Sequence, residues 1–394
     1  MKTAFLSVTA LSLAVLSSCN QEKQNRTVQI TNTLAVERSH ETIELTADTL
    51  KGLDLSKLGI KDAQTGKLVT SQTVDVDGDG ILDQLLFQPT VAANSSKKYE
   101  IIVLDTTQVN TQQKAQHLCY SRFVPERTDD YTWENDKVAF RVYGPTAQQL
   151  KETGKPNGTL SSGVDAWLKR VSYPIINKWY KETTEGTGSY HEDTGEGQDN
   201  FHVGVSRGVG GIAVKIDSSY YVSKNYTQWR TITTGPLRTS FYLEYEDWDA
   251  AGNKIKESKT ISLDLGQNFS KFNTSIQGTQ TISAGLTLHE NDGIVTGNKE
   301  QGWLSYWQPH ADSELGTAIV ASKEHFSNFE TYTSETKDHS NAYTHLNVVD
   351  QNVVYYAGFA WQKSQQYPTK EAWETHLNAF SKKVNNPLQV HLLP

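Results

Sequence analysis

The stretch Arg238–Trp248, with the sequence RTSFYLEYEDW, alternates in side-chain polarity from Thr239 to Tyr245. A period of two residues is typical of a β-strand with one buried face. Similar strands are predicted on both sides of it, separated by turns rich in Gly, Pro, Asn and Asp: Ile212–Ile216, Trp229–Thr233 and Lys259–Leu263. We therefore predict a run of successive strands through this part of the chain.

The rest of the chain continues this pattern. Further strands are predicted at Leu85–Gln88, Lys98–Leu104, Trp133–Tyr143, Ser283–His289, Gly316–Ala321 and Asn352–Phe359. Two segments are instead predicted to be helical: Ser162–Tyr180, with Ser162 as N-cap and Pro174 breaking the pattern, and the amphipathic Thr369–Lys383. Many short strands and few helices predict a mainly β protein, built as a large β-sandwich.

The composition is acidic and rich in aromatic residues. Of the 394 residues, 36% are hydrophobic, and the formal net charge is −8 at pH 7. A chain of this length can bury a large core. Its charge argues against nucleic acid as a partner, because binding to phosphates needs a basic surface. It leaves room for a small anionic ligand held by a local group of arginine and lysine side chains.

The N-terminus has the features of a bacterial lipoprotein signal peptide. A basic residue is followed by the apolar stretch Ala4–Val15 and by Leu16-Ser-Ser-Cys19, which resembles a lipobox. Residues 1–18 are predicted to be removed, Cys19 to be lipidated, and residues 19–26 to form a polar tether. We expect an outer-membrane lipoprotein that faces the periplasm and contacts the membrane through its lipid.

The segment Tyr190–Gly211, YHEDTGEGQDNFHVGVSRGVGG, carries more chemically capable groups than any other part of the chain. Its glycines and carboxylates predict loops, where catalytic and binding residues concentrate. Tyr190 and His191 can exchange protons, and Arg207 is a permanent cation. This combination suits removal of a proton next to a carboxylate. We predict His191, Tyr190 and Arg207 as catalytic residues, with a solvated acidic turn as the alternative.

A uronic acid ring would also need cations and flat aromatic surfaces from outside this segment. The residues predicted to bind the substrate are Arg141, Lys169, Trp167, His345 and Trp361. Each has a simpler alternative, since most tryptophans belong to the core and most strand arginines face water. Gly204-Val-Ser206-Arg-Gly208 also matches a serine-hydrolase elbow, but a strand is predicted after it where that motif needs a helix. Mixed His and Asp metal ligation is a further, weaker interpretation.

An acidic stretch resembles the first part of a calcium loop. Asp75, Asp77, Asp79 and Asp83 occupy its positions 1, 3, 5 and 9, with glycine at position 6. Position 12 is Leu86 where a glutamate is expected, and no helix is predicted beside the loop. A tight β-turn explains the pattern almost as well. We expect structural calcium here at most, and no cofactor requirement for catalysis.

Several long motifs together resemble one family: WENDKVAFRVYGP, SGVDAWLKRVSYPIINKWY, Tyr190–Gly211 and YYAGFAWQ. It is a number-designated family of unknown-function domains from secreted bacterial lipoproteins of polysaccharide-utilisation loci, and ulvan oligosaccharide dehydratases are the nearest resemblance. The resemblance implies a galactose-mutarotase-like β-supersandwich with a few short helices. Residues 27–394 would form one catalytic domain, with 27–110 as a possible N-terminal β subdomain.

The resemblance also implies an activity and a partner. The expected activity is removal of water from the non-reducing-end glucuronic or iduronic acid of ulvan oligosaccharides, giving a 4,5-unsaturated uronate. The partner would be an anionic sulfated oligosaccharide. Two alternatives stay open: a polysaccharide lyase that cleaves the chain by the same elimination, and a glycan-binding lipoprotein without catalysis. A binder needs aromatic residues and arginine but no paired proton-transfer groups.

Overall fold

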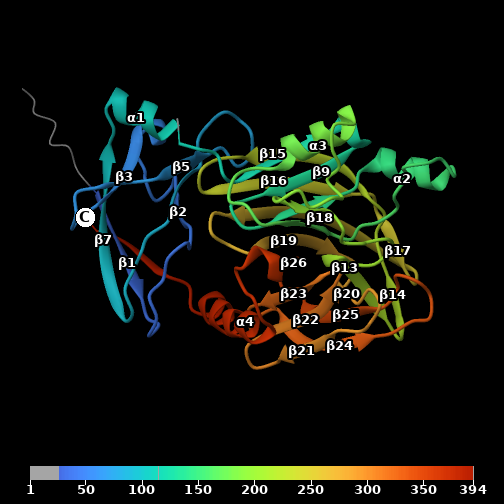
Figure 1. Cartoon of the computed structure of the whole chain (residues 1–394). Helices are drawn as coiled ribbons and strands as arrows, with labels where there is room; N and C mark the ends of the chain where they lie inside the picture. The colour runs from blue at the N-terminus through green and yellow to red at the C-terminus, as the bar shows by residue number, and fades with distance from the viewer. Residues whose placement is uncertain (1–25, 114, 394) are drawn as a thin grey trace, which may run out of the picture.

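The computed structural model describes residues 26–113 and 115–393 of the chain (Figure 1). Cys19 and the predicted signal peptide lie outside these residues. Across the described ranges no helix is both long and apolar enough to cross a membrane. The prediction of a mainly β fold with a few short helices is confirmed.

A nine-stranded antiparallel sheet forms the centre of the molecule. Its strands run in the order β15-β16-β18-β19-β26-β23-β22-β21, and β17 pairs with β18. Their bounds are β15 Tyr226–Thr233, β16 Arg238–Tyr245, β17 Trp248–Ala250, β18 Asn253–Asp264, β19 Phe269–Gln277, β21 Ile294–Asn298, β22 Trp303–His310, β23 Ser313–Ala321 and β26 Asn352–Trp361.

Two five-stranded sheets pack on one face of the central sheet. Sheet A consists of β12 Gly197–Gln198, β11 Asp165–Lys169, β10 Ala139–Val142, β9 Asp130–Glu134 and β8 Tyr120–Val124, in that order. Sheet B consists of β14 Ser219–Tyr221, β13 Val209–Ile216, β20 Thr281–Thr287, β25 Asn341–Asn347 and β24 Phe326–Tyr332.

The alternation that predicted the strands also builds the main core. Phe241 of β16 and Ile261 of β18 are cross-strand partners, and both point toward the two smaller sheets. Trp133 of sheet A donates a hydrogen bond of 2.8 Å from its indole nitrogen to Ser270, and Tyr355 donates one of 2.7 Å to the carbonyl oxygen of Gly210 in sheet B. Buried polar atoms with partners of this kind fix how the layers sit on one another.

The N-terminal residues form a separate β unit with its own core. Its larger sheet has the order β27-β1-β7-β3-β4 and the smaller one β2-β6-β5. The bounds are β1 Arg26–Asn32, β2 Ile43–Thr46, β3 Leu58–Asp62, β4 Leu68–Val69, β5 Ser71–Val74, β6 Gln84–Phe87, β7 Ser95–Val103 and β27 Gln389–Leu393. The last strand of the chain thus returns to pair with the first (Figure 1).

Four α-helices accompany the sheets of the described chain: α1 Thr106–Gln113, α2 Pro145–Glu152, α3 Ile176–Glu185 and α4 Lys370–Asn385. Short 3-10 turns occupy Leu55–Lys57, Pro125–Arg127 and Gln362–Ser364. Helix α4 confirms the predicted C-terminal helix, and Thr369 caps it by accepting from the backbone N–H of Ala372. Its Trp373 stacks on Phe269 on the outer face of the central sheet.

The structure corrects two predictions. Residues 165–169 are strand β11 where a helix was predicted, and helix α3 begins only at Ile176, after Pro174. All five residues of β11 are buried. Burial on both faces hides the alternation by which a strand is recognised, and the apolar residues Val164, Trp167, Leu168 and Val171 have the spacing of one helical face. Trp133–Tyr143 is likewise two strands, because Asn135 accepts hydrogen bonds from the N–H groups of Lys137 and Val138 and turns the chain.

Candidate active site

The site lies on the outer face of sheet A, which α3 and the following loop cover. Asp165, Trp167 and Lys169 alternate along β11 and all point to this face, whereas Ala166 and Leu168 enter the main core. The strand therefore distributes two charged residues around one tryptophan. Charges lie at both ends of the face, and aromatic packing fills the middle.

Arg141 is the centre of a buried charge cluster at one end. Its guanidinium donates to Asp165 Oδ2 at 2.9 Å from Nε and 2.6 Å from Nη2, and to Asp199 Oδ2 at 2.8 Å. Its Nη1 is 3.6 Å from Asp130 Oδ2, close enough for an ion pair but too long for a hydrogen bond. Beneath it lies the ring of Trp167, with a centroid 5.1 Å from the guanidinium carbon.

Three carboxylates thus share one guanidinium, and one of them holds a proton at neutral pH. Burial, opposed by Arg141 and reinforced by Asp165 and Asp130, raises the pKa of Asp199 to about 8. Burial likewise raises the pKa of Asp130 to about 6. Three buried atoms have no hydrogen-bond partner among the described residues: Arg141 Nη1, Asp130 Oδ1 and Asp165 Oδ1. Unpaired buried polar atoms are costly, so a fold that keeps them points to a functional site.

His191 and Tyr190 lie next to this cluster. The Nδ1–H of His191 donates to the backbone carbonyl of Asp199 at 2.6 Å, which leaves Nε2 as the unprotonated nitrogen of the neutral ring. The side chain of His191 is 62% exposed, as a group that meets a ligand must be. Tyr190 packs edge-on to it at 4.5 Å between ring centroids, and its hydroxyl accepts from Arg127 Nε at 3.3 Å.

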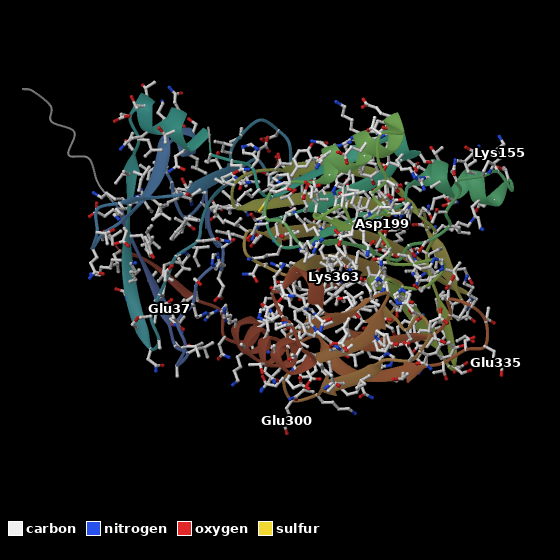
Figure 2. The ribbon with its side chains drawn as sticks, viewed as in Figure 1. Glu37, Lys155, Asp199, Glu300, Glu335 and Lys363 are labelled. Atoms are coloured by element: carbon white, nitrogen blue, oxygen red, sulfur yellow. The ribbon has the colours of Figure 1, made fainter. Side chains whose placement is uncertain are left out.

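A cavity of about 540 Å³, a size typical of ligand sites, opens beside His191 and Arg141, whereas Tyr190 is buried and is not part of its lining. The cavity lining includes Arg127, Arg141, Tyr143, His191 and Asp199 from around the charge cluster, and it also includes Lys151, His202 and Asp338. Figure 2 shows Asp199 enclosed among side chains below α3, whereas Lys155 stands at the outer end of α2.

Two glycines allow the segment Tyr190–Gly211 to lie directly against β11 of sheet A and the residue before it. Gly197 has a φ of +120°, and a Cβ there would lie 2.0 Å from the carbonyl oxygen of Leu168. Gly208 has a φ of +56°, and its Cβ would lie 1.9 Å from the carbonyl oxygen of Val164. No other residue type fits either position. The glycines of this loop are therefore required for docking and not only for mobility.

Arg207, predicted to neutralise a substrate carboxylate, lies outside the cavity wall. It is buried, and its guanidinium donates to Ser162 Oγ at 2.9 Å and to the carbonyl oxygens of Ile212 and Val205. Ser206 is buried beside it, and strand β13 follows at Val209, so no nucleophile elbow is formed. Arg141, Arg127 and Lys151 are the cations that the fold places at the cavity, and the two arginines lie on the side of His191.

Lys169 and Trp167 are likewise structural. All three N–H groups of Lys169 are used, by Glu134 Oε2 at 2.7 Å and by the carbonyl oxygens of Asn135 and Tyr173 at 2.8 and 2.9 Å. Trp167 is fully buried beneath the ring of Tyr190, 5.1 Å away. Trp167 supports the site from below, whereas Lys169 has no N–H left for a ligand.

His345 and Trp361 lie elsewhere. His345 is on the outer face of sheet B, where its Nδ1 is 2.9 Å from Ser283 Oγ and its Nε2 3.6 Å from Glu330. Trp361 is buried in the main core. Neither contributes to the cavity beside His191.

In the acidic loop, carboxylate oxygens of Asp75, Asp77 and Asp83 lie within 4.8 Å of one another. Asp79 stands apart from this group, and its Oδ1 accepts from the N–H of Ile81 at 2.7 Å. The flanking elements are strands β5 and β6, which differ from the helices of an EF-hand. The N–H groups of Gly78 and Gly80 donate to the carboxylate of Asp75 at 2.7 and 2.8 Å, as in a tight turn.

The sequence analysis missed Arg127, Asp130 and Asp165 as site residues and considered Asp199 only within the mixed His and Asp metal interpretation. Asp199 lay inside the segment that was singled out, and Arg141–Asp165 could have been sought as opposite charges on adjacent strands. Arg127 carries no local signal, because it reaches Tyr190 only through the tertiary fold.

The fold and the site together describe a layered β-sandwich protein with a buried charge cluster that opens on a ligand-sized cavity. The model of a domain of unknown function, DUF4861, matches residues 30–390, and the chain belongs to this family. It is 51% identical over 397 residues to "Uncharacterized protein P7" of Formosa agariphila, and the match covers 100% of both chains.

Solved structures resemble the fold at low sequence identity. A protein in the glycosyl hydrolase family 38 from Enterococcus faecalis matches with a TM-score of 0.50 and 11% identity, over 94% of this chain and 47% of that one. An alpha-mannosidase from the same organism matches with a TM-score of 0.45 and 11% identity, over 94% and 46%. The chain therefore spans about half the length of these structures, and the first of them supports the sandwich architecture alone.

Proposed function

We propose that this protein is a carbon–oxygen lyase that removes water from the non-reducing-end uronic acid of ulvan oligosaccharides. One observation carries the proposal: the cavity places His191, with its Nδ1–H held by the carbonyl of Asp199, beside the guanidinium groups of Arg127 and Arg141. A base next to cations is what proton removal α to a carboxylate requires.

The reaction follows from these groups. Arg141 and Arg127 neutralise the uronate carboxylate, which makes the C5 proton more acidic. The unprotonated Nε2 of His191 takes that proton, a C4=C5 double bond forms, and the C4–O bond breaks. The C4 hydroxyl leaves as water after receiving one proton. Two groups can supply that proton. The carboxyl of Asp199 lines the cavity, and its pKa of about 8 keeps it protonated at pH 7. The hydroxyl of Tyr190 is buried beside His191 and would need to reach the cavity past that ring.

Mass spectrometry of uronate-terminated ulvan oligosaccharides tests the proposal. We expect the mass of one water to be lost without shortening of the chain, and His191→Ala to reduce turnover by at least about 100-fold. His391→Ala is the matched control, because His391 is an exposed residue of β27 far from the cavity. Shortened products would identify a polysaccharide lyase, and unchanged oligosaccharides would favour a glycan-binding protein.

The proposed function also implies a cellular location. We propose a lipoprotein of the outer membrane, anchored through Cys19 and facing the periplasm, where an oligosaccharide imported from outside would reach it. Cys19→Ala should release the protein from membranes or leave the precursor uncleaved. A variant that is processed and membrane-bound like the parent would contradict the anchor.

A further inference from the structure

A second cavity lies on the opposite side of the central sheet from His191. Its volume is about 340 Å³, within the range of sites for small ligands. Its walls come from three parts of the molecule: β2 of the N-terminal unit, the outer face of the central sheet, and α4 with the segment leading to β27. Figure 1 shows the chain passing from α4 back to the N-terminal unit along this boundary.

The floor of this cavity is a row of three polar side chains on adjacent strands. Ser262 of β18 is the cross-strand partner of Lys271 of β19, and Lys271 is the partner of Tyr356 of β26. Cross-strand partners lie about 5 Å apart, so the three polar groups are neighbours. All three line the cavity, and all three are partly buried.

The polar side-chain groups of Ser262, Lys271 and Tyr356 are free of partners within the described protein. Throughout the described residues, neither the ammonium of Lys271 nor the hydroxyl of Tyr356 has a hydrogen-bond or ion-pair partner, and the hydroxyl of Ser262 has none either. Burial raises the pKa of Tyr356 to about 12, so its hydroxyl is a donor at neutral pH. Lys271 thus presents a free positive charge at the centre of the row.

The other charges of the cavity are mostly neutralised. Arg238 donates to Asp264 at 2.6 and 2.9 Å and to Glu44 at 2.5 Å, and Glu41 pairs with Arg38. Lys383 adds only a long ion pair of 3.8 Å to Glu41. The lining thus carries three carboxylates (Glu41, Glu44 and Asp264) and three cations (Arg238, Lys271 and Lys383). Lys271, on the floor, is the one of these charges that has no ion-pair partner among the described residues.

The roof is apolar. Phe380 of α4 meets the ring of Tyr356 edge-on at 5.3 Å between centroids, and Val384 and Leu388 continue the surface. A pyranose matches a cavity with an apolar roof and a polar floor. Its C–H groups suit aromatic and aliphatic contacts, while its hydroxyls need hydrogen bonds. A carboxylate on the ring would meet the Lys271 ammonium.

We propose that this cavity is a second, non-catalytic binding site for an acidic sugar unit, held by Lys271, Tyr356 and Ser262 beneath Phe380. The choice of a uronate as ligand rests on the proposed function, whereas the site itself rests on the free cation and hydroxyls of the floor. A site of this kind would retain a second uronate of a long substrate, and tethering two sites raises the apparent affinity.

Binding of methyl β-D-glucuronide, measured by calorimetry, tests the site, with methyl β-D-glucoside as the analogue that lacks the carboxylate. On a His191→Ala background, which keeps Arg127 and Arg141 at the first cavity, we expect two binding events. Lys271→Met should weaken one of them by about 10- to 100-fold, the scale of one charge-assisted hydrogen bond, and leave the other unchanged. Lys67→Met is the matched control, since Lys67 is an exposed lysine of the N-terminal unit. The glucoside should bind at least about 10-fold more weakly than the glucuronide.

Lysine acetylation followed by peptide mass spectrometry places the ligand directly. The glucuronide should slow acetylation of Lys271 and leave that of Lys67 unchanged. Equal protection of both lysines, or unaltered binding in Lys271→Met, would overturn the second site. Because turnover is assayed separately through His191, a protein that binds at Lys271 without dehydrating its substrate would disprove only the proposed function.

Discussion

The two ends of the outer face of sheet A both bury charged side chains, but only one end pairs all of them. At one end Lys169 and Glu134 form a closed pair: the three N–H groups of Lys169 are used, and Glu134 also accepts from the backbone N–H groups of Ile175 and Ile176. At the other end Arg141 faces three carboxylates, and three buried polar atoms remain unpaired. The same strands thus hold one ion pair that is balanced and one cluster that is not.

The difference indicates which end is the site. A balanced and fully hydrogen-bonded pair has no capacity for a ligand, and its removal should affect folding. An unbalanced cluster shifts pKa values and retains unused donors, which are the properties of catalytic groups. Burial alone does not distinguish the two ends, because both are buried.

The largest effect should come from breaking the closed pair. Lys169→Met should lower the free energy of unfolding by about 3–5 kcal/mol, because it leaves the buried carboxylate of Glu134 uncompensated. Urea denaturation measures this loss. The double variant Lys169→Met/Glu134→Gln should recover part of it, and the variants that fold should dehydrate uronates at nearly the parental rate. A Lys169→Met protein that is fully stable but inactive would reverse the roles of the two ends.

The opposite behaviour is expected beside the open cluster. Tyr190→Phe should reduce turnover by about 100-fold if the hydroxyl protonates the departing oxygen, while the melting temperature stays nearly unchanged because the ring is kept. Tyr332→Phe, in β24 of sheet B, is the control. If Tyr190→Phe retains full activity and Asp199→Asn loses it, Asp199 is the proton donor.

The charge imbalance should also appear as a pH dependence of stability. Since the pKa of Asp199 rises from 3.8 to about 8 on folding, the native state holds a proton that the unfolded state releases between these values. The contribution of Asp199 to stability therefore declines as pH rises from about 4 to 8. Asp199→Asn should flatten this decline when melting temperatures are compared across that range. An unchanged slope would show that the proton lies on another carboxyl of the cluster.

The smallest effect is expected where carboxylates face water. If calcium binds the loop at Asp77, Asp77→Ala should lower the melting temperature only when calcium is present, because an ion that binds only the native state stabilises it. We expect a change of no more than about 1 kcal/mol in the free energy of unfolding, since single surface substitutions rarely exceed this. An equal loss in the presence of a chelator would favour the turn.

The sequence predicted the fold better where one face of a strand is buried than where both are. Alternation in Thr239–Tyr245 correctly identified β16, and the capped amphipathic pattern identified α4. The same rules failed at Asp165–Lys169, because sheet A is covered on both faces and its charged residues are buried with the apolar ones. The candidate site shows the same division: His191 and Arg141, which line the cavity, were among the residues predicted from the sequence, while Arg127, Asp130 and Asp165 were not.

The sequence by itself determined the mainly β architecture, the C-terminal helix and the segment around His191, because these depend on periodicity, capping and local composition. Only the tertiary structure decided which cations line the cavity. Arg141 and Arg207 are both buried arginines, yet one meets three carboxylates at a cavity wall and the other is used by backbone carbonyls. What a buried charge does depends on which partners surround it, and those partners come from strands far apart in the chain.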